Sequence, residues 1–344
     1  MDLTPSCSTV TVRFIDTTTR IITPNDCADC TIKGAQLLNC PLFAFLIERR
    51  LLLDLGLRPD YENLPPVRLS VEKGVSQLLA EHGVDPKTIE AIIWSHWHYD
   101  HTGDPSTFPS TTLLMVGPVN STLRIMKMRP GSAEDAIDYF GEKSFYILDA
   151  PGHTLGHLCA LAPTTNDPDS FILMGADACH RSAEMRPSKW LPLPSEISPH
   201  QLQLDATGPG PASDFEHLLR NDVSQLPIYA QKRPGQMLFN PDMAEGTLDK
   251  IEEADGTGNI FVVIAHDDHL SGTVDFSPKP ANKLLFQGWD VERRWKFLAD
   301  FRQALLGGHK LSAGAPGSGP CSSIPLTIPL NIPLRTHEIQ RLEQ

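Results

Sequence analysis

Short apolar runs recur along the chain, and they have the length of buried strands. The clearest are residues 51–55, 89–94, 145–149, 171–174 and 261–265. Runs of four to six apolar residues bounded by turn-forming residues predict strands inside a packed core. Each run contains, or is soon followed by, an acidic residue or a histidine, which is a costly choice in a core unless that side chain has a partner.

β-branched and apolar residues predict further strands between these runs. Residues 8–22 predict a strand or a hairpin, and residues 43–47 predict the first arm of a hairpin with 51–55. Residues 111–116 predict another buried strand, and residues 158–161 begin a hairpin that returns through 171–174.

Apolar residues at helical spacing predict helices in other segments. Ser70 has the position of an N-cap for a helix that ends at Gly83, and further helices are predicted over 213–219, 243–254 and 297–305. Strands and helices that are interspersed in this way are compatible with a fold of the α+β class.

The chain divides into a body and a tail. Residues 1–308 carry the predicted elements, with an insertion at about 181–256. Residues 309–344 contain closely spaced prolines, which favour an extended or disordered tail over a helix or an inner strand.

Composition narrows the classes of partner. A formal net charge of −13 argues against a nucleic-acid substrate, which normally needs a basic face. We see neither a secretory signal nor a run long enough to span a membrane. Seven cysteines form no regular framework, which is typical of reduced thiols in the cytoplasm. We therefore expect a cytoplasmic protein that acts on a small molecule, as a monomer or a homodimer.

Side chains that can bind a metal are most concentrated directly after the 89–94 run. His96, His98, Asp100 and His101 fall within six residues of each other. Neutral imidazole and carboxylate are ligands that suit zinc and similar divalent metals. A strand that ends in this pattern predicts a metal site.

Other strand ends supply the remaining candidates. His153 follows Gly152, which lets the backbone turn, and Asp177 and His266 come just after apolar runs. We interpret His153 and Asp177 as further ligands. Asp54 fits a loop-capping hydrogen bond better than direct ligation. A supporting or core role suits His157, and Cys179 reads as a buried, inert thiol.

Taken in order, these motifs resemble those of the metallo-β-lactamase superfamily. The resemblance rests on Asp54 after a strand, on His-x-His-x-Asp-His at 96–101, on His153 in Pro-Gly-His, on Asp177 after Gly-Ala and on His266 after the last strand. It implies a four-layer αββα sandwich with the metal site at one edge, between two sheets.

The resemblance also distributes the ligands between two ions. It implies one ion held by His96, His98 and His153, and a second held by Asp100, His101 and His266. Asp177 would bridge them. It implies two zinc ions per chain, and manganese or iron also suits these ligands. The expected nucleophile is a hydroxide that bridges the metals, with Asp100 as the proton shuttle.

Within the superfamily, the pattern is most similar to N-acyl homoserine lactonases and to fungal enzymes that open lactams and lactones. That branch commonly has a tyrosine three residues after the bridging aspartate, where it hydrogen-bonds the substrate carbonyl. This chain has His180 there, which either donates to an oxyanion or is an ordinary surface residue. Trp190, in a proline-rich stretch, predicts an apolar pocket that accepts aromatic groups.

The predicted function is metal-dependent hydrolysis of a cyclic amide or ester, with Asp100 and His180 as the catalytic residues. The alternatives are a thioesterase, a phosphodiesterase or nuclease, and a non-catalytic binding protein on the same fold. We see no Lys/Arg cluster for a thioester carrier, and no candidate ligand is missing, as a binding protein would predict.

Overall fold

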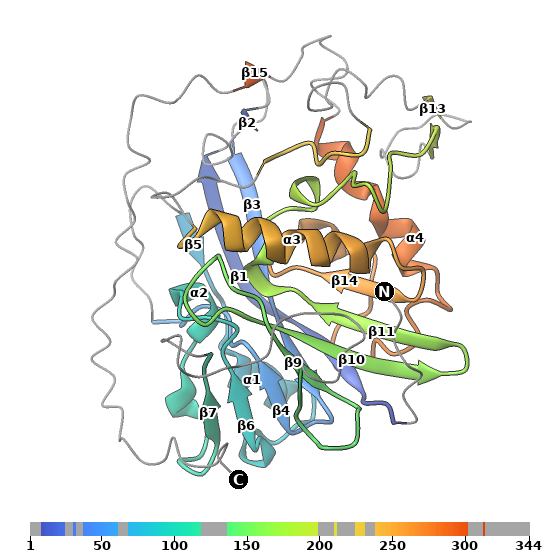
Figure 1. Cartoon of the computed structure of the whole chain (residues 1–344). Helices are drawn as coiled ribbons and strands as arrows, with labels where there is room; N and C mark the ends of the chain where they lie inside the picture. The colour runs from blue at the N-terminus through green and yellow to red at the C-terminus, as the bar shows by residue number, and fades with distance from the viewer. Residues whose placement is uncertain are drawn as a thin grey trace.

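Two mixed β-sheets form the centre of the protein (Figure 1). The computed structural model describes residues 8–24, 30–31, 37–60, 68–117, 136–198, 210–211, 224–230, 238–301 and 312–313 of the 344-residue chain.

The first sheet contains most of the N-terminal strands, in the order β5-β1-β3-β4-β6-β7. Its strands are β1 (Val12–Pro24), β3 (Leu37–Ile47), β4 (Leu51–Leu53), β5 (Arg68–Ser70), β6 (Ala91–Ile93) and β7 (Leu113–Met115). β4, β6 and β7 run parallel to one another, whereas β1 is antiparallel to β3 and β5. The carboxyl ends of β4 and β6 therefore meet at one edge of the sheet.

The second sheet has the order β14-β11-β10-β9-β8. Its strands are β8 (Ala136–Asp138), β9 (Tyr146–Asp149), β10 (Leu158–Asn166), β11 (Asp169–Met174) and β14 (Ile260–Val263). β11 and β14 are parallel, and β10 is antiparallel to both β9 and β11. Thus β9, β11 and β14 point the same way and deliver their carboxyl ends to one edge.

The two sheets pack face to face around the main core. Phe14 and Phe45 of the first sheet share one apolar cluster with Ile172 and Phe261 of the second. The rings of Phe14 and Phe261 stack across the interface with centroids 6.5 Å apart. Strand residues alternate between the two faces of a sheet, so the apolar side chains between these positions face outward and need a second cover.

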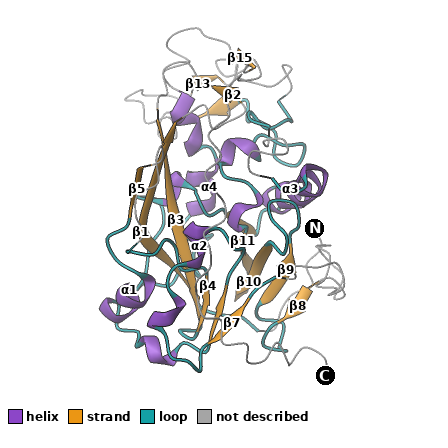
Figure 2. Ribbon diagram, turned by 90° about the vertical axis from the view of Figure 1, so that its left-hand side faces the viewer, coloured by secondary structure: helices purple, strands orange, loops and turns teal. Residues whose placement is uncertain are grey.

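Helices supply that cover. α1 (Val75–Glu81) packs Leu79 on the outer face of the first sheet, and α3 (Pro241–Asp255) packs Ile251 on the outer face of the second. Figure 2 shows α1 and α3 on opposite sides of the paired sheets. This confirms the predicted αββα layering. Among the described residues, no helix combines the length and the apolar character that crossing a membrane requires.

Short elements complete the described chain. The described residues also form two short α-helices, α2 (Tyr99–Thr102) and α4 (Trp289–Arg294), and six 3-10 helices. These are η2 (Pro86–Thr88), η3 (Pro105–Thr107), η4 (Ala176–Ala178), η5 (Ser182–Glu184), η8 (Asp268–Leu270) and η9 (Lys296–Phe301). Two small ladders pair β2 (Cys30–Thr31) with β15 (Ser312–Ala313) and β12 (Glu196–Ile197) with β13 (Gly210–Pro211).

Three predicted elements need correction. Ser70 is not an N-cap, because it ends β5 and the helix begins at Val75. The strand within 111–116 is not buried, because β7 is the last strand of its sheet and Leu113 is 63% exposed. The segment 297–305 begins as the 3-10 helix η9, and the structure does not describe its residues after 301.

Two other predictions lie outside the described residues. The helix over 213–219 is one of them. The tail 309–344 is the other, apart from 312–313 in β15.

Candidate metal centre

The predicted ligands meet at the edge where strands of both sheets end. His96, His98, Asp100 and His101 follow β6, and His153 follows β9. Asp177 lies in η4 after β11, and His266 follows β14. Backbone hydrogen bonds join these loops: Leu158 N donates to Ser95 O over 2.7 Å, and Ala265 N donates to Ala176 O over 2.9 Å.

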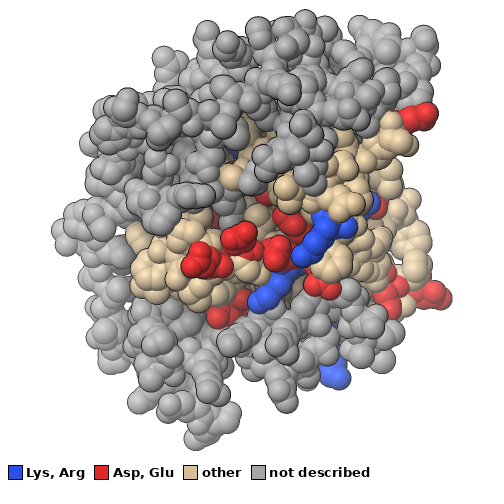
Figure 3. All heavy atoms as spheres, turned by 45° about the horizontal axis from the view of Figure 1, so that its top comes forward, with Lys and Arg blue, Asp and Glu red and all other residues tan. Residues whose placement is uncertain are grey.

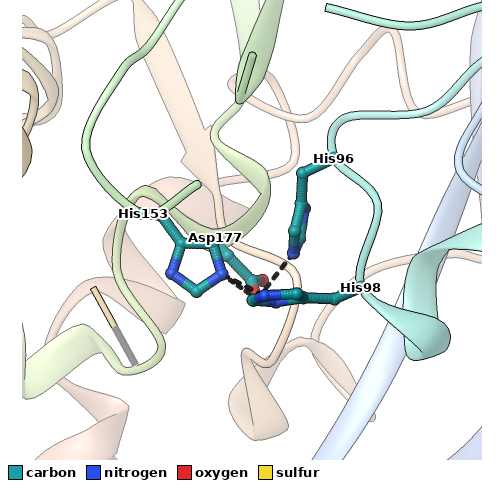
Figure 4. A group of neighbouring side chains, drawn as sticks. All are labelled: His96, His98, His153 and Asp177. Carbon is teal, nitrogen blue, oxygen red and sulfur yellow. Dashed lines mark hydrogen bonds and ion pairs between the residues drawn. The ribbon is translucent and has the colours of Figure 1, made fainter. Parts of the chain in front are cut away.

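Asp177 lies at the centre of the group. Its Oδ2 is 3.6 Å from His96 Nε2 and 3.4 Å from His153 Nε2, and the Nδ1 atom of His98 lies 3.0 Å from that His153 nitrogen. In Figure 4 the three imidazoles converge on the carboxylate from two separate loops. One atom from each of these four buried residues could hold a metal ion.

A second group faces the other oxygen of the same carboxylate. Asp177 Oδ1 lies 3.3 Å from His101 Nε2 and 3.4 Å from His266 Nε2. Asp100 Oδ2 is 3.9 Å and 3.7 Å from the same two ring nitrogens. Asp100, His101 and His266 form the second group that could hold an ion.

Unpaired polar atoms provide a test of whether these residues fit metal ions. His96 Nε2, His101 Nε2 and Asp177 Oδ1 are buried and have no hydrogen-bond partner among the described residues. Buried polar atoms are normally paired, and such orphans need an explanation. All three point into the site, and imidazole with carboxylate is a donor set for divalent transition metals. The residues therefore fit a two-ion centre.

The outer nitrogens of the rings are held by other groups. His101 Nδ1 lies 2.8 Å from Asp54 Oδ2, His266 Nδ1 lies 3.1 Å from Pro41 O, and His96 Nδ1 lies 3.0 Å from Ser95 Oγ. Partners of this kind fix the tautomer and the orientation of metal-binding histidines. Sequence reasoning did not single out Ser95 or Pro41.

Asp54 has the supporting role that its position predicted. Its carboxylate accepts hydrogen bonds from the backbone N of Ser95 at 2.7 Å and from Ser95 Oγ at 2.8 Å, in addition to its contact with His101. It joins the end of β4 to the loop after β6. His157 also supports the site, because its Nδ1 donates to Ala150 O and its Nε2 accepts from Asp177 N at 3.1 Å.

Burial sets the protonation of the first group. It lowers the pKa of His96 and His153 well below the ordinary value, and it lowers the pKa of His98 to about 4. These rings are therefore neutral at pH 7, which is the form that binds metals.

The second group is more strongly coupled to carboxylates. Burial opposes the charged form of His101, but Asp177, Asp54 and Asp100 outweigh it and raise the His101 pKa. Burial likewise opposes the charged form of Asp177, but His101 and His266 outweigh it and hold the Asp177 pKa well below its usual range. Asp177 is thus an anion, as a bridging ligand needs to be.

His180 lies at the opening of the site. Its Nε2 is 3.5 Å from Asp177 Oδ2, and its ring stacks on that of His266 with centroids 5.7 Å apart. The side chain is 21% exposed, so it borders both the site and solvent. Glu184, which sequence reasoning did not single out, accepts a hydrogen bond from the backbone N of His180 at 3.0 Å.

Trp190 does not lie near these residues. It packs on Gly256 at the end of α3, where a Cβ atom would be 2.6 Å from Trp190 Cβ. The first turn of the same helix packs Ala244 on Gly152, beside His153. A rise of 1.5 Å per residue places about 18 Å of helix between the two contacts. The prediction that Trp190 lines the pocket was therefore wrong.

The charged surface is mixed. Figure 3, which turns the top of Figure 1 toward the viewer, shows acidic side chains gathered beside a few Lys and Arg side chains on the described part of this face.

Comparison with known proteins agrees with the site. The sequence model of the metallo-beta-lactamase superfamily matches residues 39–164. The chain is 37% identical to the gamma-lactamase FDB1 of Fusarium pseudograminearum (strain CS3096), over 86% of this chain and 83% of the relative. It is 37% identical to the metallo-hydrolase mfmC of Annulohypoxylon moriforme, over 87% of this chain and 89% of that protein. Longer curated relatives also match, and the chain spans 39% of their length.

A solved structure supports the fold. The crystal structure of a quorum-quenching N-acyl homoserine lactone hydrolase has a TM-score of 0.52, covering 81% of this chain and 100% of that chain. Its sequence identity is 17%, so this likeness concerns the fold alone. Together with the paired His/Asp groups, these findings show that the chain belongs to the metallo-beta-lactamase superfamily and is a metal-dependent hydrolase.

Proposed function

We propose that the protein opens a cyclic amide or ester, a lactam or a lactone, by adding water across the bond between the carbonyl carbon and the ring nitrogen or oxygen. The observation that carries this proposal is the placement of Asp177. One of its oxygens faces His96 and His153, and the other faces His101 and His266, each within 3.6 Å. A single carboxylate shared in this way suits two neighbouring cations.

The ligands divide between the two groups. His96, His98 and His153 would hold one cation, Asp100, His101 and His266 the other, and Asp177 would contact both. Two zinc ions are the proposed occupants, because their site is built from nitrogen and oxygen donors. Such ions lower the pKa of a water molecule toward neutrality and polarise a carbonyl oxygen.

Asp100 is the proposed proton carrier. Its Oδ2 lies 3.7 Å from His266 Nε2 and 3.9 Å from His101 Nε2, so it faces the other two members of the second group. When water attacks the carbonyl carbon, Asp100 would accept the proton that the water loses. It would then deliver that proton to the ring nitrogen or oxygen as the C–N or C–O bond breaks.

His180 is the proposed carbonyl donor. Its Nε2 atom has no hydrogen-bond partner among the described residues, although it faces the site. Asp177 and Glu184 raise the His180 pKa even though burial opposes the charged ring, so an N–H at this position is favoured. A donor placed at the opening can stabilise the negative charge that develops on the carbonyl oxygen.

The relatives favour a lactam over a lactone. A curated relative of 37% identity is named gamma-lactamase, whereas the likeness to the lactone hydrolase structure is 17% identical. Since whole-length sequence similarity is the stronger guide to substrate, a γ-lactam is the first substrate to test.

Two measurements test the proposal together. Elemental analysis should find about two zinc ions per chain, and a screen of γ-lactams, lactones and thioesters should show ring opening as the gain of one water by mass spectrometry. At saturating zinc, Asp100→Asn should lower turnover by about 10² to 10⁴ fold. Asp104→Asn is the matched control, because that carboxylate caps Ser106 in the next loop and pairs with Arg58, and neither partner is a proposed ligand.

Turnover of thioesters alone would contradict the proposal. So would an Asp100→Asn enzyme that keeps wild-type turnover, because the proton would then travel by another route.

A further inference from the structure

The segment 289–301, which contains α4 and η9, contacts the loop that follows His266. Lys296 Nζ donates to Thr273 Oγ1 over 2.7 Å. Asp300 Oδ2 lies 3.1 Å from Nε2 of His269. The Asp300 contact lies at the surface and the Lys296 contact is partly buried, whereas a third contact, made from α4, is buried.

Arg293 of α4 makes that inner contact. Its side chain is buried, and its Nη1 donates to the carboxylate of Asp267, the residue directly after His266. Its Nη2 donates to the carbonyl oxygen of Val262, and its guanidinium lies 4.5 Å from the centroid of the Phe261 ring. Val262 and Phe261 belong to β14, the strand that leads to His266. One guanidinium therefore holds the chain on both sides of His266.

The Asp267 carboxylate contacts the turn that follows as well as Arg293. Its Oδ1 accepts a hydrogen bond from the backbone N of His269 at 3.1 Å, which starts η8, while its other oxygen faces Arg293. The direction in which the chain leaves His266 is thus fixed by the carboxylate.

The His266 ring has few other restraints of its own. Its Nδ1 contacts Pro41 O at 3.1 Å, and its Nε2 faces Asp177 and Asp100. A ring in this position reaches the second group only if its backbone is correctly placed, because a metal ligand must be held to within about 0.5 Å.

A buried ion pair is weak evidence for a stabilising role. Removing two charges from water often costs as much as their attraction returns, and apolar replacements can be neutral or stabilising. The protein nevertheless places Arg293 and Asp267 beside a candidate ligand. Groups that orient ligands typically change metal affinity by about 10 to 100 fold when they are altered.

We propose that Arg293, acting through Asp267, is a positioning residue that sets cation affinity at the group formed by Asp100, His101 and His266. This inference rests on the proposed two-ion function. It concerns the second group and leaves the first, which contains no residue from β14 or α4, unchanged.

The chain offers a matched control in another buried pair. Arg186 Nε donates to Asp255 Oδ2 over 2.7 Å, and its Nη2 donates to Oδ1 over 2.5 Å. Both residues are buried, and within the described parts of the chain neither makes a hydrogen bond or ion pair with a proposed ligand. Arg186 Nη1 also donates to Arg294 O in α4 over 3.2 Å, so substitutions in this pair disturb the packing of α4 without altering the contact between Arg293 and Asp267.

The test is a zinc titration of the full chain against a competing chelator, which gives a stepwise affinity for each ion. Arg293→Lys keeps the charge but loses the planar fork, and Asp267→Asn keeps an acceptor for His269 but loses the charge. We expect both substitutions to weaken the zinc affinity of the second group by about 10 to 100 fold and that of the first group by less than about threefold. Arg186→Lys and Asp255→Asn should leave both affinities within about threefold of wild type, as should Asp300→Asn at the surface.

Circular dichroism and thermal unfolding of each metal-free variant separate this effect from loss of the fold. If the second affinity is unchanged in folded Arg293→Lys and Asp267→Asn, the positioning role is wrong while the two-ion centre stands. Equal weakening of both affinities, or the same effect in the Arg186 and Asp255 variants, would also overturn it. A wild-type chain that binds fewer than two ions would overturn the two-ion function itself, and this inference with it.

Discussion

Asp54 and His101 come from different strand ends, yet the Asp54 carboxylate lies 2.8 Å from Nδ1 of His101. The same carboxylate accepts the backbone N–H of Ser95. It therefore holds the ring from behind and leaves the opposite nitrogen, Nε2, facing Asp177 at 3.3 Å.

This relationship gives the first prediction. Asp54→Asn should weaken the affinity of the second zinc by about 10 to 100 fold, because the amide cannot orient and polarise the imidazole as a carboxylate does. The fold should persist, since the amide oxygen can still accept from Ser95 N. A chelator-competition titration measures the effect, with Asp104→Asn as the control. An unchanged second affinity would show that Asp54 only caps the loop.

Gly152 and Gly246 give a prediction about the backbone. Gly152 has a φ of +130°, and a Cβ atom there would lie 2.2 Å from Ala244 N. Gly152→Ala should therefore destabilise the protein by at least about 2 kcal/mol, because the positive φ and the close approach both penalise a side chain. It should also weaken zinc binding through the adjacent His153.

Gly246 is the matched control in the same region. It lies within α3, and a Cβ atom there would meet nothing within 4 Å. Gly246→Ala should stabilise the protein by about 0.5 to 1 kcal/mol through helix propensity alone. Urea unfolding of the two variants measures both free energies. Equal effects of the two substitutions would contradict the close packing between α3 and the loop that carries His153.

Glu252 gives a prediction about pH. Burial in α3 raises its pKa from 4.5 to about 8, and Asp249 adds to the shift. In the unfolded chain the carboxyl ionises near pH 4.5, whereas in the folded protein it keeps its proton until about pH 8. This contribution to the free energy of unfolding is therefore fully present below pH 4.5 and is lost as the pH rises to 8.

Glu252→Gln should remove that loss. The variant should be more stable than wild type by about 1 kcal/mol at pH 8, a figure well below full conversion of the shift because the carboxyl keeps some contact with water. The difference should vanish near pH 4.5. Denaturant unfolding across this pH range measures it. Glu245→Gln, an exposed change in the same helix, should follow the wild-type profile.

The sequence predicted the strand ends well because burial on both faces leaves an unbroken apolar run. Ile92 faces α1 while Ala91 and Ile93 face the second sheet, so the run before His96 has no polar interruption. The same signal misled at 111–116, since an apolar run does not reveal whether a strand lies inside a sheet or at its edge. Leu113 lies at the edge.

Long-range contacts account for most of what the sequence did not reveal. Ser70 looked like a cap until pairing with Arg20 placed it in β5. Arg293 stands far along the chain from Asp267 and lies in a polar stretch that gives no hint of burial. The candidate ligands could be picked out because the sequence concentrates them at strand ends, whereas the groups that contact them come from distant segments that only the fold brings together.

The last prediction concerns His180 and compares its replacement by Phe and by Tyr, whose side chains differ by one hydroxyl. His180→Phe keeps an aromatic ring to stack on His266 but removes the donor, so it should lower kcat by about 10² to 10³ fold with little change in KM. His180→Tyr restores a donor and should keep kcat within about tenfold of wild type. Zinc content should be unchanged in both, and steady-state kinetics on the best lactam or lactone substrate measures the rest. If the Phe and Tyr variants lost activity equally, the ring and not its N–H would be what matters. If either lost zinc, His180 would be a ligand and not a donor to the carbonyl.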